Sequence, residues 1–293
     1  MFEKVLVALD FSVHSQKILD RIGEIPGIQE VVLLHVVDAT HPSRLGWTHG
    51  PHIENAKILM GEKKDALEHI GLKVHINVDV IVNAITQGSV PLTILETAAT
   101  RNVSLIIMGA RGINPIQELL LGSVSSSVLR HAKTSVLVLH ISPEPDDADL
   151  LLCSSHQQLF SKVLVPTDFS PSASNAAAGI NTLQGIKEIV LLHVVTRGES
   201  QQEIDNYVKE AQLRLEDMKT EFISMGAEVK IHVRVGDPTE MILSVAEEDD
   251  VSMTAMSASG TGWLREMLLG STTFTVVRRT KRPVLVLRTG QET

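Results

Sequence analysis

Short apolar runs occur at intervals along the first half of the chain. They cover Val5–Leu9, Val31–Val37, Leu105–Met108 and Ser135–His140, and an alternating segment spans Val74–Val82. Apolar runs of this length that are rich in β-branched residues predict strands buried on both faces, as in a parallel sheet.

Segments in which apolar residues have helical spacing lie between these runs. We expect a first helix with Ser12 as its N-cap, a long helix at about Glu54–Ile70, a third at Val90–Thr100 and a fourth that begins near Ser123. Short strands that alternate with helices predict an α/β fold, in which right-handed crossovers cover both faces of a parallel sheet.

The same pattern occurs a second time. The segment FEKVLVALDFS at 2–12 returns as FSKVLVPTDFS at 160–170, and IQEVVLLHVV at 28–37 returns as IKEIVLLHVV at 186–195. The two copies of each segment are 158 residues apart. This period is too long for the unit of a solenoid, and it indicates a duplicated domain.

The distance between the copies is shorter near their ends. The segment LLLGSVSSSVLRHAKTSVLVL at 119–139 corresponds to MLLGSTTFTVVRRTKRPVLVL at 267–287, which is 148 residues later. The first copy therefore carries about ten additional residues, and we expect them in the stretch rich in His, Gly and Pro at Thr40–Pro51.

The length of 293 residues fits two domains of ordinary size. We predict domains at 1–142 and 160–293, with an acidic, proline-bearing linker at 143–159 between them. Cys153 is the single cysteine, which excludes an intramolecular disulfide and favours a reducing, cytoplasmic setting. The first residues show no pattern of a signal peptide.

Charge and aromatic content narrow the range of partners. The net charge of −9 disfavours duplex DNA and anionic membrane surfaces, because their phosphate groups would be repelled. An aromatic content of 3% also disfavours a stacking platform for single strands. We therefore expect no nucleic-acid partner, and no membrane partner either, since no apolar run approaches the roughly 20 residues of a membrane-spanning helix.

Candidate chemistry lies where the first and fourth strands end. In a doubly wound sheet, ligands bind beyond the carboxyl ends of the strands, at the point where the strand order reverses. Asp10 follows the first strand, and Gly109, Gly112, Gly122 and Ser123 follow the fourth. Glycines allow backbone amides to approach phosphate oxygens, and a helix that begins at Gly122 directs unpaired amides at the same anion.

The side chains near these glycines complement a nucleotide. The hydroxyl groups of Ser123, Ser125 and Ser126 can add donors to a phosphate, and Asp10 suits sugar hydroxyls or a divalent cation such as Mg²⁺. Glycine spacing alone is a weak signal, because a turn followed by a helix cap gives the same pattern. Its recurrence in both halves, each time with an aspartate after the first strand, favours a nucleotide site.

Several motifs resemble those of the universal stress protein family. They are the loop Gly-x2-Gly-x9-Gly-Ser after a strand that ends IIMG, the opening V-x-x-D-F-S and the second strand LLHVV. The resemblance implies two tandem flavodoxin-like domains of the adenine nucleotide alpha hydrolase type, each a five-stranded parallel sheet in the order 3-2-1-4-5. It also implies a bound adenine nucleotide, either ATP or AMP left after hydrolysis.

The resemblance extends to assembly. Single-domain members of the family dimerise through their last strand, which implies that Val136–Leu139 and Val284–Leu287 pair within one chain as an internal pseudo-dimer. Such pairing would cover an apolar sheet edge that otherwise favours aggregation. The resemblance is also compatible with a homodimer of two whole chains.

Carried over by position, the family pattern assigns roles in the first half. Ala8 and Asp10 would lie around the nucleoside, and Val36 would contact the adenine through its backbone. Arg111 lies inside the loop, where it either screens phosphate charge or is simply solvated. The residues that would line the ribose and the phosphates follow the fourth strand: Met108, Gly109, Gly112, Gly122, Ser123, Val124 and Ser125.

The second half departs from the pattern at one position. Ser257 replaces the first glycine of the loop, and if that position needs a positive φ or a close backbone approach, serine costs roughly 1 kcal/mol there. One hypothesis is that an intact first site and a weakened second site form a regulatory pair. Binding of two nucleotides per chain would contradict this hypothesis. The other positions are retained: Pro166, Asp168, Val194, Met256, Gly260, Gly270, Ser271, Thr272 and Thr273.

Three functions are compatible with these motifs. The first is a stress-response sensor or regulator that binds ATP or AMP, the second is a slow ATP hydrolase, and the third is an interaction module that binds no nucleotide. The phosphate loop G-x4-G-K-[ST] is absent and no residue supplies a convincing base, so we assign no catalytic residue. The intact first loop counts against the third function. His41, His49 and His52 lie in the segment peculiar to the first copy, where we expect a polar loop and no metal site.

Overall fold

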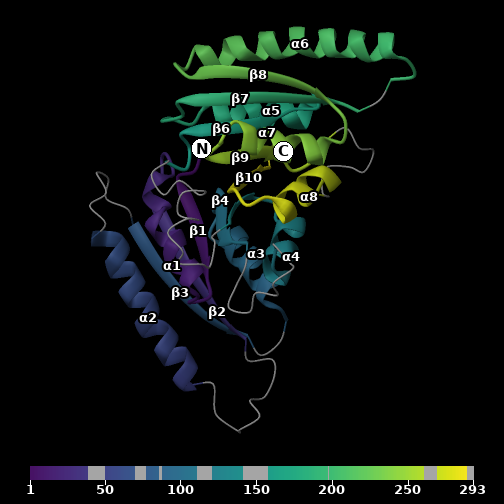
Figure 1. Cartoon of the computed structure of the whole chain (residues 1–293). Helices are drawn as coiled ribbons and strands as arrows, with labels where there is room; N and C mark the ends of the chain where they lie inside the picture. The colour runs from purple at the N-terminus through teal and green to yellow at the C-terminus, as the bar shows by residue number, and fades with distance from the viewer. Residues whose placement is uncertain are drawn as a thin grey trace. The chain divides into compact units, whose positions relative to one another are not determined.

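The chain folds into two compact units, Met1–Pro143 and Glu144–Thr293. Each unit is a layered α/β structure, shown in the computed structural model of Figure 1. The predicted linker boundaries stay a prediction, because most of that segment lies outside the described residues. The structure describes residues 1–38, 50–69, 77–85, 88–110, 121–140, 158–196, 198–260 and 269–288.

The first unit is built on a parallel sheet. Its strand order is β3-β2-β1-β4-β5, the order that the family resemblance implies. The order reverses between β1 and β4, which is where ligands bind in sheets of this kind. The five strands are β1 Lys4–Leu9, β2 Glu30–Asp38, β3 Asn77–Ile85, β4 Leu105–Gly109 and β5 Ser135–Leu139.

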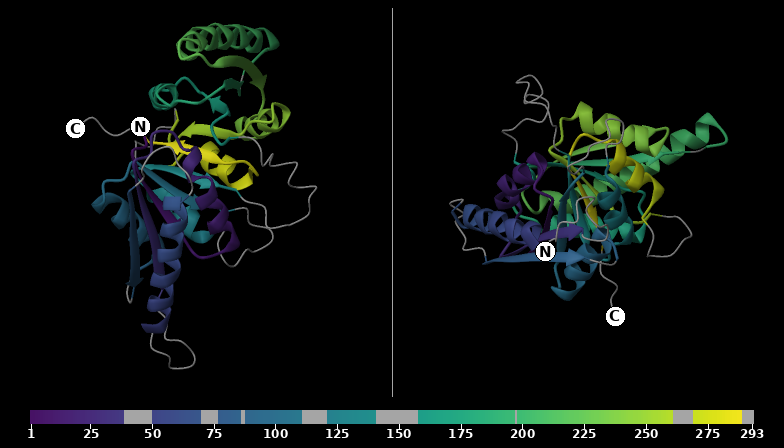
Figure 2. Two further views of the ribbon diagram at one scale, coloured as in Figure 1. Left: turned by 90° about the vertical axis from the view of Figure 1, so that its left-hand side faces the viewer. Right: turned by 90° about the horizontal axis from the view of Figure 1, so that it is seen from below.

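Helices cover both faces of this sheet. Right-handed crossovers place the first two helices on one face and the last two on the other. Helix α2 lies along β2 and β3, and α3 contacts α4 (Figure 2). Helix α3 matches the predicted range, with Ser89 as its N-cap residue and a proline in its first turn. The helices are α1 Val13–Asp20, α2 Gly50–His69, α3 Val90–Thr100 and α4 Ser123–His131, with a short 3₁₀ turn at Ile22–Glu24.

The second unit repeats this plan. Its strand order is β8-β7-β6-β9-β10, which is again 3-2-1-4-5 when counted within the unit. Helix α6 covers β7 and β8, and α7 contacts α8 (Figure 1). The elements are β6 Lys162–Pro166, α5 Pro171–Asn181, β7 Glu188–Val195, α6 Gln201–Ile223, β8 Glu228–Val235, α7 Pro238–Glu248, β9 Met253–Ser257, α8 Ser271–Arg279 and β10 Val284–Leu287.

Polar caps fix the starts of three helices in the second unit. The Ser170 hydroxyl accepts from the amide of Ala173, the Ser200 hydroxyl from that of Glu203, and the Asp237 carboxylate from that of Glu240. Each cap satisfies an amide that the helix itself leaves without a partner. The helix after each of β6, β7 and β8 therefore begins at a defined residue.

Two predicted boundaries in the first unit are wrong. Helix α2 begins at Gly50, one turn before the expected Glu54. Strand β3 continues to Ile85, beyond the expected end at Val82, because its ladder with β2 extends until Asp38 pairs with Ile85. The alternation of valines marked the strand correctly, but it is interrupted at Asn83 and Ala84 before the buried Ile85.

The additional residues of the first copy are divided between two places. The first residues of β2 and β7 are 158 positions apart, those of β3 and β8 are 151 apart, and those of α3 and α7 are 148 apart. Seven of the ten extra residues therefore lie between the start of β2 and the start of β3, and three lie between the start of β3 and the start of α3. The expectation that all ten belong to Thr40–Pro51 is corrected accordingly.

Within the described part of the chain, no helix combines the length and the apolar character that crossing a membrane requires. No group of three or more His, Cys, Asp or Glu side chains in the same ranges could hold a metal ion. His41 and His49 lie outside the described residues, and the side chain of His52 is not described either.

Candidate functional site

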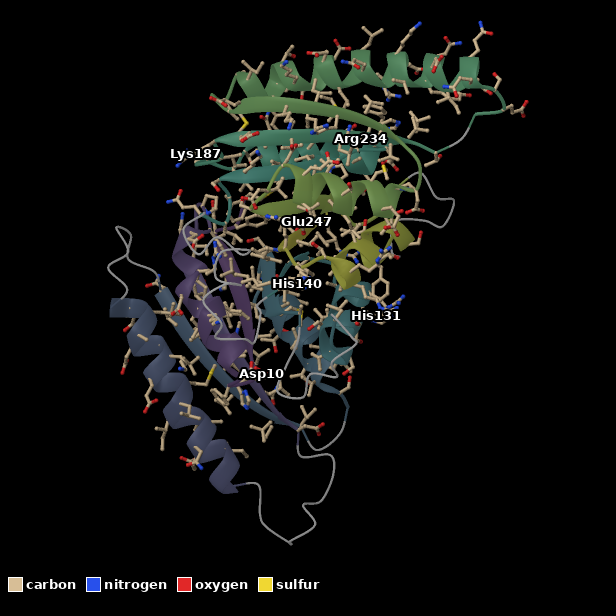
Figure 3. All side chains as sticks on the ribbon, in the orientation of Figure 1. Asp10, His131, His140, Lys187, Arg234 and Glu247 are labelled. Atoms are coloured by element: carbon tan, nitrogen blue, oxygen red, sulfur yellow. The ribbon has the colours of Figure 1, made fainter. Side chains whose placement is uncertain are left out.

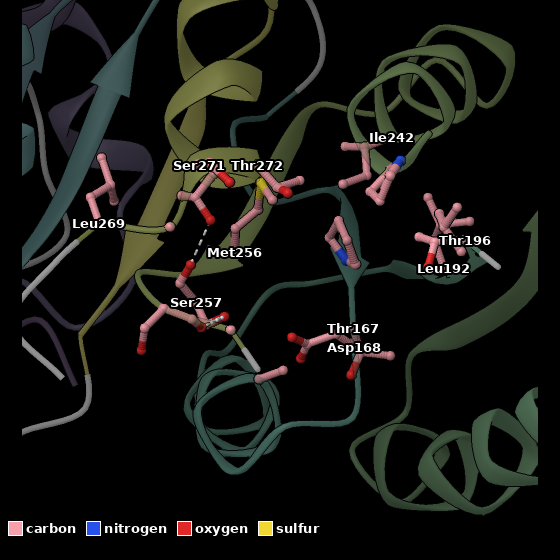
Figure 4. A pocket seen from close by; sticks show the side chains of 18 residues that line it. Thr167, Asp168, Leu192, Thr196, Ile242, Met256, Ser257, Leu269, Ser271 and Thr272 are labelled. Carbon is pink, nitrogen blue, oxygen red and sulfur yellow. Dashed lines mark hydrogen bonds between the residues drawn. The ribbon is translucent and has the colours of Figure 1, made fainter. Parts of the chain in front are cut away.

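A pocket with a volume of about 640 Å³ opens at the carboxyl ends of β6, β7 and β9. Its volume is in the usual range for small-molecule sites. Figure 4 shows Thr167 and Asp168 on one side of it and Met256, Ser271 and Thr272 on the other. The structure brings together all ten candidate residues of the second half here: Pro166, Asp168, Val194, Met256, Ser257, Gly260, Gly270, Ser271, Thr272 and Thr273.

The pocket also contains residues that the sequence analysis missed. Leu192 and Ile242 form an apolar wall with Val194, and Thr196 and Ser259 add hydroxyl groups. Thr196 directly follows β7, so its position at the carboxyl end of a strand was a usable signal. Ile242 comes from α7, which carries none of the recognised motifs, and no sequence signal pointed to it.

Backbone amides at the start of α8 form the second wall. The amide of Phe274 makes the first helical hydrogen bond, to the carbonyl oxygen of Gly270 at 2.9 Å. The amides of Ser271, Thr272 and Thr273 have no acceptor among the described residues. The helix end also carries about half a positive charge, so this wall suits an anion.

The glycine before α4 and the glycine before α8 each use their amide within the protein, so this amide does not donate to an anion. The expectation that the amide of Gly122 binds phosphate is corrected accordingly. The amide of Gly270 donates to the carbonyl of Ala258, and the amide of Gly122 donates to that of Ala110, both at 2.7 Å. The amides of Ala258 and Ala110 in turn donate to the last residues of β10 and β5. We call this chain of two bonds the backbone relay. It leaves the three following amides as the donors.

The hydroxyl groups of Ser125 and Thr273 are also used internally. Ser125 Oγ donates to the Gly109 carbonyl at 2.7 Å, and Thr273 Oγ1 donates to the Ser257 carbonyl at 2.9 Å. Both side chains are about 5% exposed. The expectation that Ser125 adds a phosphate donor is therefore wrong, because its hydroxyl ties the helix start to the end of the neighbouring strand.

Thr273→Val should destabilise the second unit by about 1–3 kcal/mol, since valine keeps the shape but removes the donor to a buried carbonyl. Urea unfolding measures the change. Thr275→Val is the matched control: Thr275 Oγ1 donates to Ser271 within the same helix but is exposed, so we expect less than about 0.5 kcal/mol there. Equal effects of the two substitutions would contradict the assigned role of Thr273.

Ser257 is accommodated without backbone strain. Neither Ser257 nor Gly109 has a positive φ, so the first position of the loop does not require glycine for its conformation. The Ser257 hydroxyl donates to the Ser259 carbonyl at 2.7 Å. The part of the expected penalty that depends on a positive φ therefore does not apply at Ser257.

Each site aspartate lies in the same local turn. Asp168 Oδ1 accepts from the amide of Ser170 at 3.0 Å, and Asp10 Oδ1 accepts from the amide of Ser12 at 3.0 Å. A Cβ atom added to Gly260 would lie 2.6 Å from Asp168 Oδ2. Gly260 is therefore needed because the carboxylate comes so close to the loop backbone.

The first unit places its candidates at the equivalent ends of the strands. Leu9 pairs with His35, so the next residues along the two strands are Asp10 and Val36. Figure 3 labels Asp10 in the first unit. Arg111 and Gly112 lie outside the described residues, so their part in the site stays a prediction. The candidates that the structure describes lie at the ends of β1, β2 and β4 and at the start of α4: Ala8, Asp10, Val36, Met108, Gly109, Gly122, Ser123, Val124 and Ser125.

A histidine lies behind each aspartate. His35 Nδ1 is 2.8 Å from the Leu9 carbonyl, and His193 Nδ1 is 2.8 Å from the Thr167 carbonyl, so each ring donates a hydrogen bond to the strand end. Burial lowers the pKa of both rings, because the charged form loses its water. Arg214 lowers the pKa of His193 further, while Asp168 and Glu210 oppose the shift.

We expect the stability of the protein to fall as the pH is lowered from 7 to 5. The two histidines titrate near 6.5 when unfolded and at a lower pH when folded. Between these values the unfolded state binds more protons, so stability rises with pH and is complete above about pH 7. Melting temperatures measured against pH should show a shallower slope in a His35→Asn, His193→Asn variant, and an unchanged slope would contradict this assignment.

Comparisons with known proteins agree with the fold. A model of the universal stress protein family matches residues 1–140 and again residues 159–288. A universal stress protein of Mycolicibacterium smegmatis is 24% identical, and the match covers 97% of this chain and 96% of that protein. A universal stress protein of Methanocaldococcus jannaschii is 32% identical over 155 residues, covering 44% of this chain and 96% of that protein. The crystal structure of a universal stress protein from Archaeoglobus fulgidus matches with a TM-score of 0.65 at 27% identity, over 99% of this chain and 97% of that one.

Proposed function

Since the chain belongs to the universal stress protein family, which matches both of its halves, we propose that it is a stress-response regulator that binds adenine nucleotides. The observation that carries the proposal is the pocket of the second unit. It offers an apolar wall at Leu192 and Ile242, a carboxylate at Asp168 and the unpaired amides at the start of α8. These three features complement a base, a ribose and a phosphate.

We propose ATP or AMP as the ligand, with Mg²⁺ as an accessory ion for ATP. Asp168 is the only charged side chain among the described residues that line the pocket. Its negative charge would repel a triphosphate, and a divalent cation with oxygen ligands would offset that repulsion. We expect ATP affinity to depend on Mg²⁺ more strongly than AMP affinity does.

We further propose that both units bind nucleotide. The helix start, the backbone relay and the aspartate turn have the same hydrogen bonds in the two units, and Ser257 introduces no positive φ. The absence of a positive φ at Ser257 means that this departure from the family pattern adds no backbone strain, which supports two competent sites. A stoichiometry of two per chain supports this proposal, whereas a stoichiometry of one supports a regulatory pair with a single competent site.

Calorimetric titration of the purified chain with ATP and AMP, with and without Mg²⁺, tests the proposal. Acid extraction of the same preparation shows whether adenine nucleotide is already bound. Retention of intact ATP over hours supports a binding role, and steady release of phosphate would identify a slow hydrolase instead. No binding of either nucleotide and no thermal shift would leave an interaction module that needs no nucleotide.

The assembly of the protein remains a proposal from its sequence. An internal pseudo-dimer through Val136–Leu139 and Val284–Leu287 predicts that the isolated chain needs no second copy to cover its last strands. Light scattering of the purified chain should then give the mass of one chain, 31.9 kDa. Twice that mass would favour a homodimer.

A further inference from the structure

The residue after each site aspartate has a backbone conformation that aromatic residues rarely adopt. Phe11 has a φ of 61° and Phe169 a φ of 59°. For residues other than glycine, this left-handed region is disfavoured, because Cβ comes close to the following carbonyl oxygen. Such strain persists only where the surrounding structure holds it, and it tends to occur at functional sites. Here it occurs twice at the same position of the duplicated fold.

A histidine ring holds each phenylalanine. The rings of Phe169 and His193 are stacked with centroids 4.4 Å apart and planes 23° apart, and those of Phe11 and His35 are 4.1 Å and 33° apart. In the second unit, the guanidinium of Arg214 lies 3.9 Å above the Phe169 ring. Ring contacts of this kind are attractive, and they offset the cost of the strain.

The same histidine also holds the peptide on the other side of the aspartate. His193 donates to the carbonyl of Thr167, and His35 donates to that of Leu9. The imidazole ring of His193 therefore fixes both neighbours of Asp168: it binds the carbonyl of Thr167 and stacks on the ring of Phe169. Asp10 lies between Leu9 and Phe11 in the same way.

This arrangement determines where the carboxylate points. Asp168 Oδ1 accepts from the Ser170 amide at 3.0 Å, which directs Oδ2 toward the loop at Gly260 inside the pocket. A residue with an ordinary negative φ at position 169 would rotate the following peptide, and the Ser170 amide would no longer face Oδ1. The strained φ and the direction of the carboxylate are thus parts of one turn.

We propose that Phe11 with His35, and Phe169 with His193, are positioning residues that aim the aspartate carboxylates at the ribose hydroxyls of the bound nucleotide. This inference rests on the proposed function. It gives the strained phenylalanine and the half-buried histidine a role that core packing alone does not require. It also predicts that losing the stack affects the recognition of the ribose and leaves the phosphate contacts unchanged.

The test replaces both phenylalanines with glycine in the full chain. Glycine adopts positive and negative φ about equally readily, so Phe11→Gly with Phe169→Gly removes the stack that holds the turn, frees the residue to leave the positive φ, and adds no strain to the folded backbone. Calorimetry compares AMP with 2′,3′-dideoxy-AMP. The wild type should prefer AMP by about tenfold or more, as expected for a hydrogen bond to a charged group. In the variant, AMP affinity should fall about tenfold, while dideoxy-AMP affinity changes less than twofold.

Two further variants separate positioning from general stability. Asn102 has a φ of 51° and lies after α3, so Asn102→Gly relieves the same kind of strain and should leave both affinities unchanged. His35→Asn with His193→Asn keeps an amide donor near the position of Nδ1 but removes the ring, and it should lose the ribose preference as the glycine variant does.

The outcomes distinguish the two proposals. A wild type that binds neither nucleotide overturns the proposed function and this inference with it. A wild type that binds AMP, together with a glycine variant that keeps its preference for the ribose, overturns only the positioning role. Equal loss of AMP and dideoxy-AMP affinity in the glycine variant also overturns it, because that result indicates a pocket distorted as a whole.

Discussion

Gly260→Ala is expected to weaken nucleotide binding in the second unit about 10- to 100-fold while leaving the fold intact. The new Cβ would lie 2.6 Å from Asp168 Oδ2, far inside contact distance. Because the obstacle is a side-chain carboxylate, the protein relieves the clash by rotating Asp168 away. Losing a hydrogen bond to a charged group costs roughly 1.5–3 kcal/mol, which gives the expected loss of affinity.

Calorimetric stoichiometry measures this change, and the number of tight sites per chain should fall from two to one. Gly270→Ala is the matched control within the same pocket. Its Cβ would meet the Ala258 carbonyl oxygen at 3.5 Å, an ordinary contact, so we expect less than a threefold change. If both alanines weakened binding equally, the Asp168 carboxylate would not be the group that matters.

Phe222→Ala is expected to destabilise the second unit by about 3–5 kcal/mol, through lost burial and the cavity that remains. Phe222 is fully buried on α6, the helix that covers β7 and β8. The free energy of unfolding in urea measures the effect. Because the chain consists of two compact units, we expect the transition of the second unit to move to lower urea and that of the first to stay.

Leu213→Ala is the control on the same helix. Leu213 is 69% exposed, so its truncation should change stability by less than about 0.5 kcal/mol. A large effect at Leu213 would mean that another surface covers this side of α6 in solution. A small effect at Phe222 would mean that α6 contributes little to the core of its unit.

The sequence predicts the sheet of each unit because its signals are local. The apolar runs and the duplicated motifs place every strand of the first unit to within a few residues, whereas the resemblance to the family selects the ten second-half candidates, which line one pocket. What they miss depends on backbone geometry. The amide of Gly122 is taken by Ala110, and the hydroxyl of Ser125 by Gly109, through contacts that no spacing reveals.

Ser257 also shows that backbone geometry is not visible in the sequence. A serine in place of glycine indicated a weakened loop, but the part of the penalty that depends on φ is absent, because φ there is not positive. Conversely, the phenylalanine in D-F-S gave no sign of strain, although both copies have a positive φ at that residue. Ile242 enters the pocket from a helix whose residues look like ordinary core.

Because of the backbone relay, we expect each unit to tolerate foreign sequences in its loop. Its bonds join Ala110 to Gly122 and Ala258 to Gly270, so the two stems of each loop are clamped at a fixed separation. Lengthening a clamped loop costs only about 0.6 kcal/mol for each doubling. Seven of the eleven intervening residues already differ between the two copies. Grafting a peptide epitope or a metal-binding hairpin between these stems should therefore leave the helix amides where they are. Each chain thus offers two loops, one per unit, for the design of biosensors.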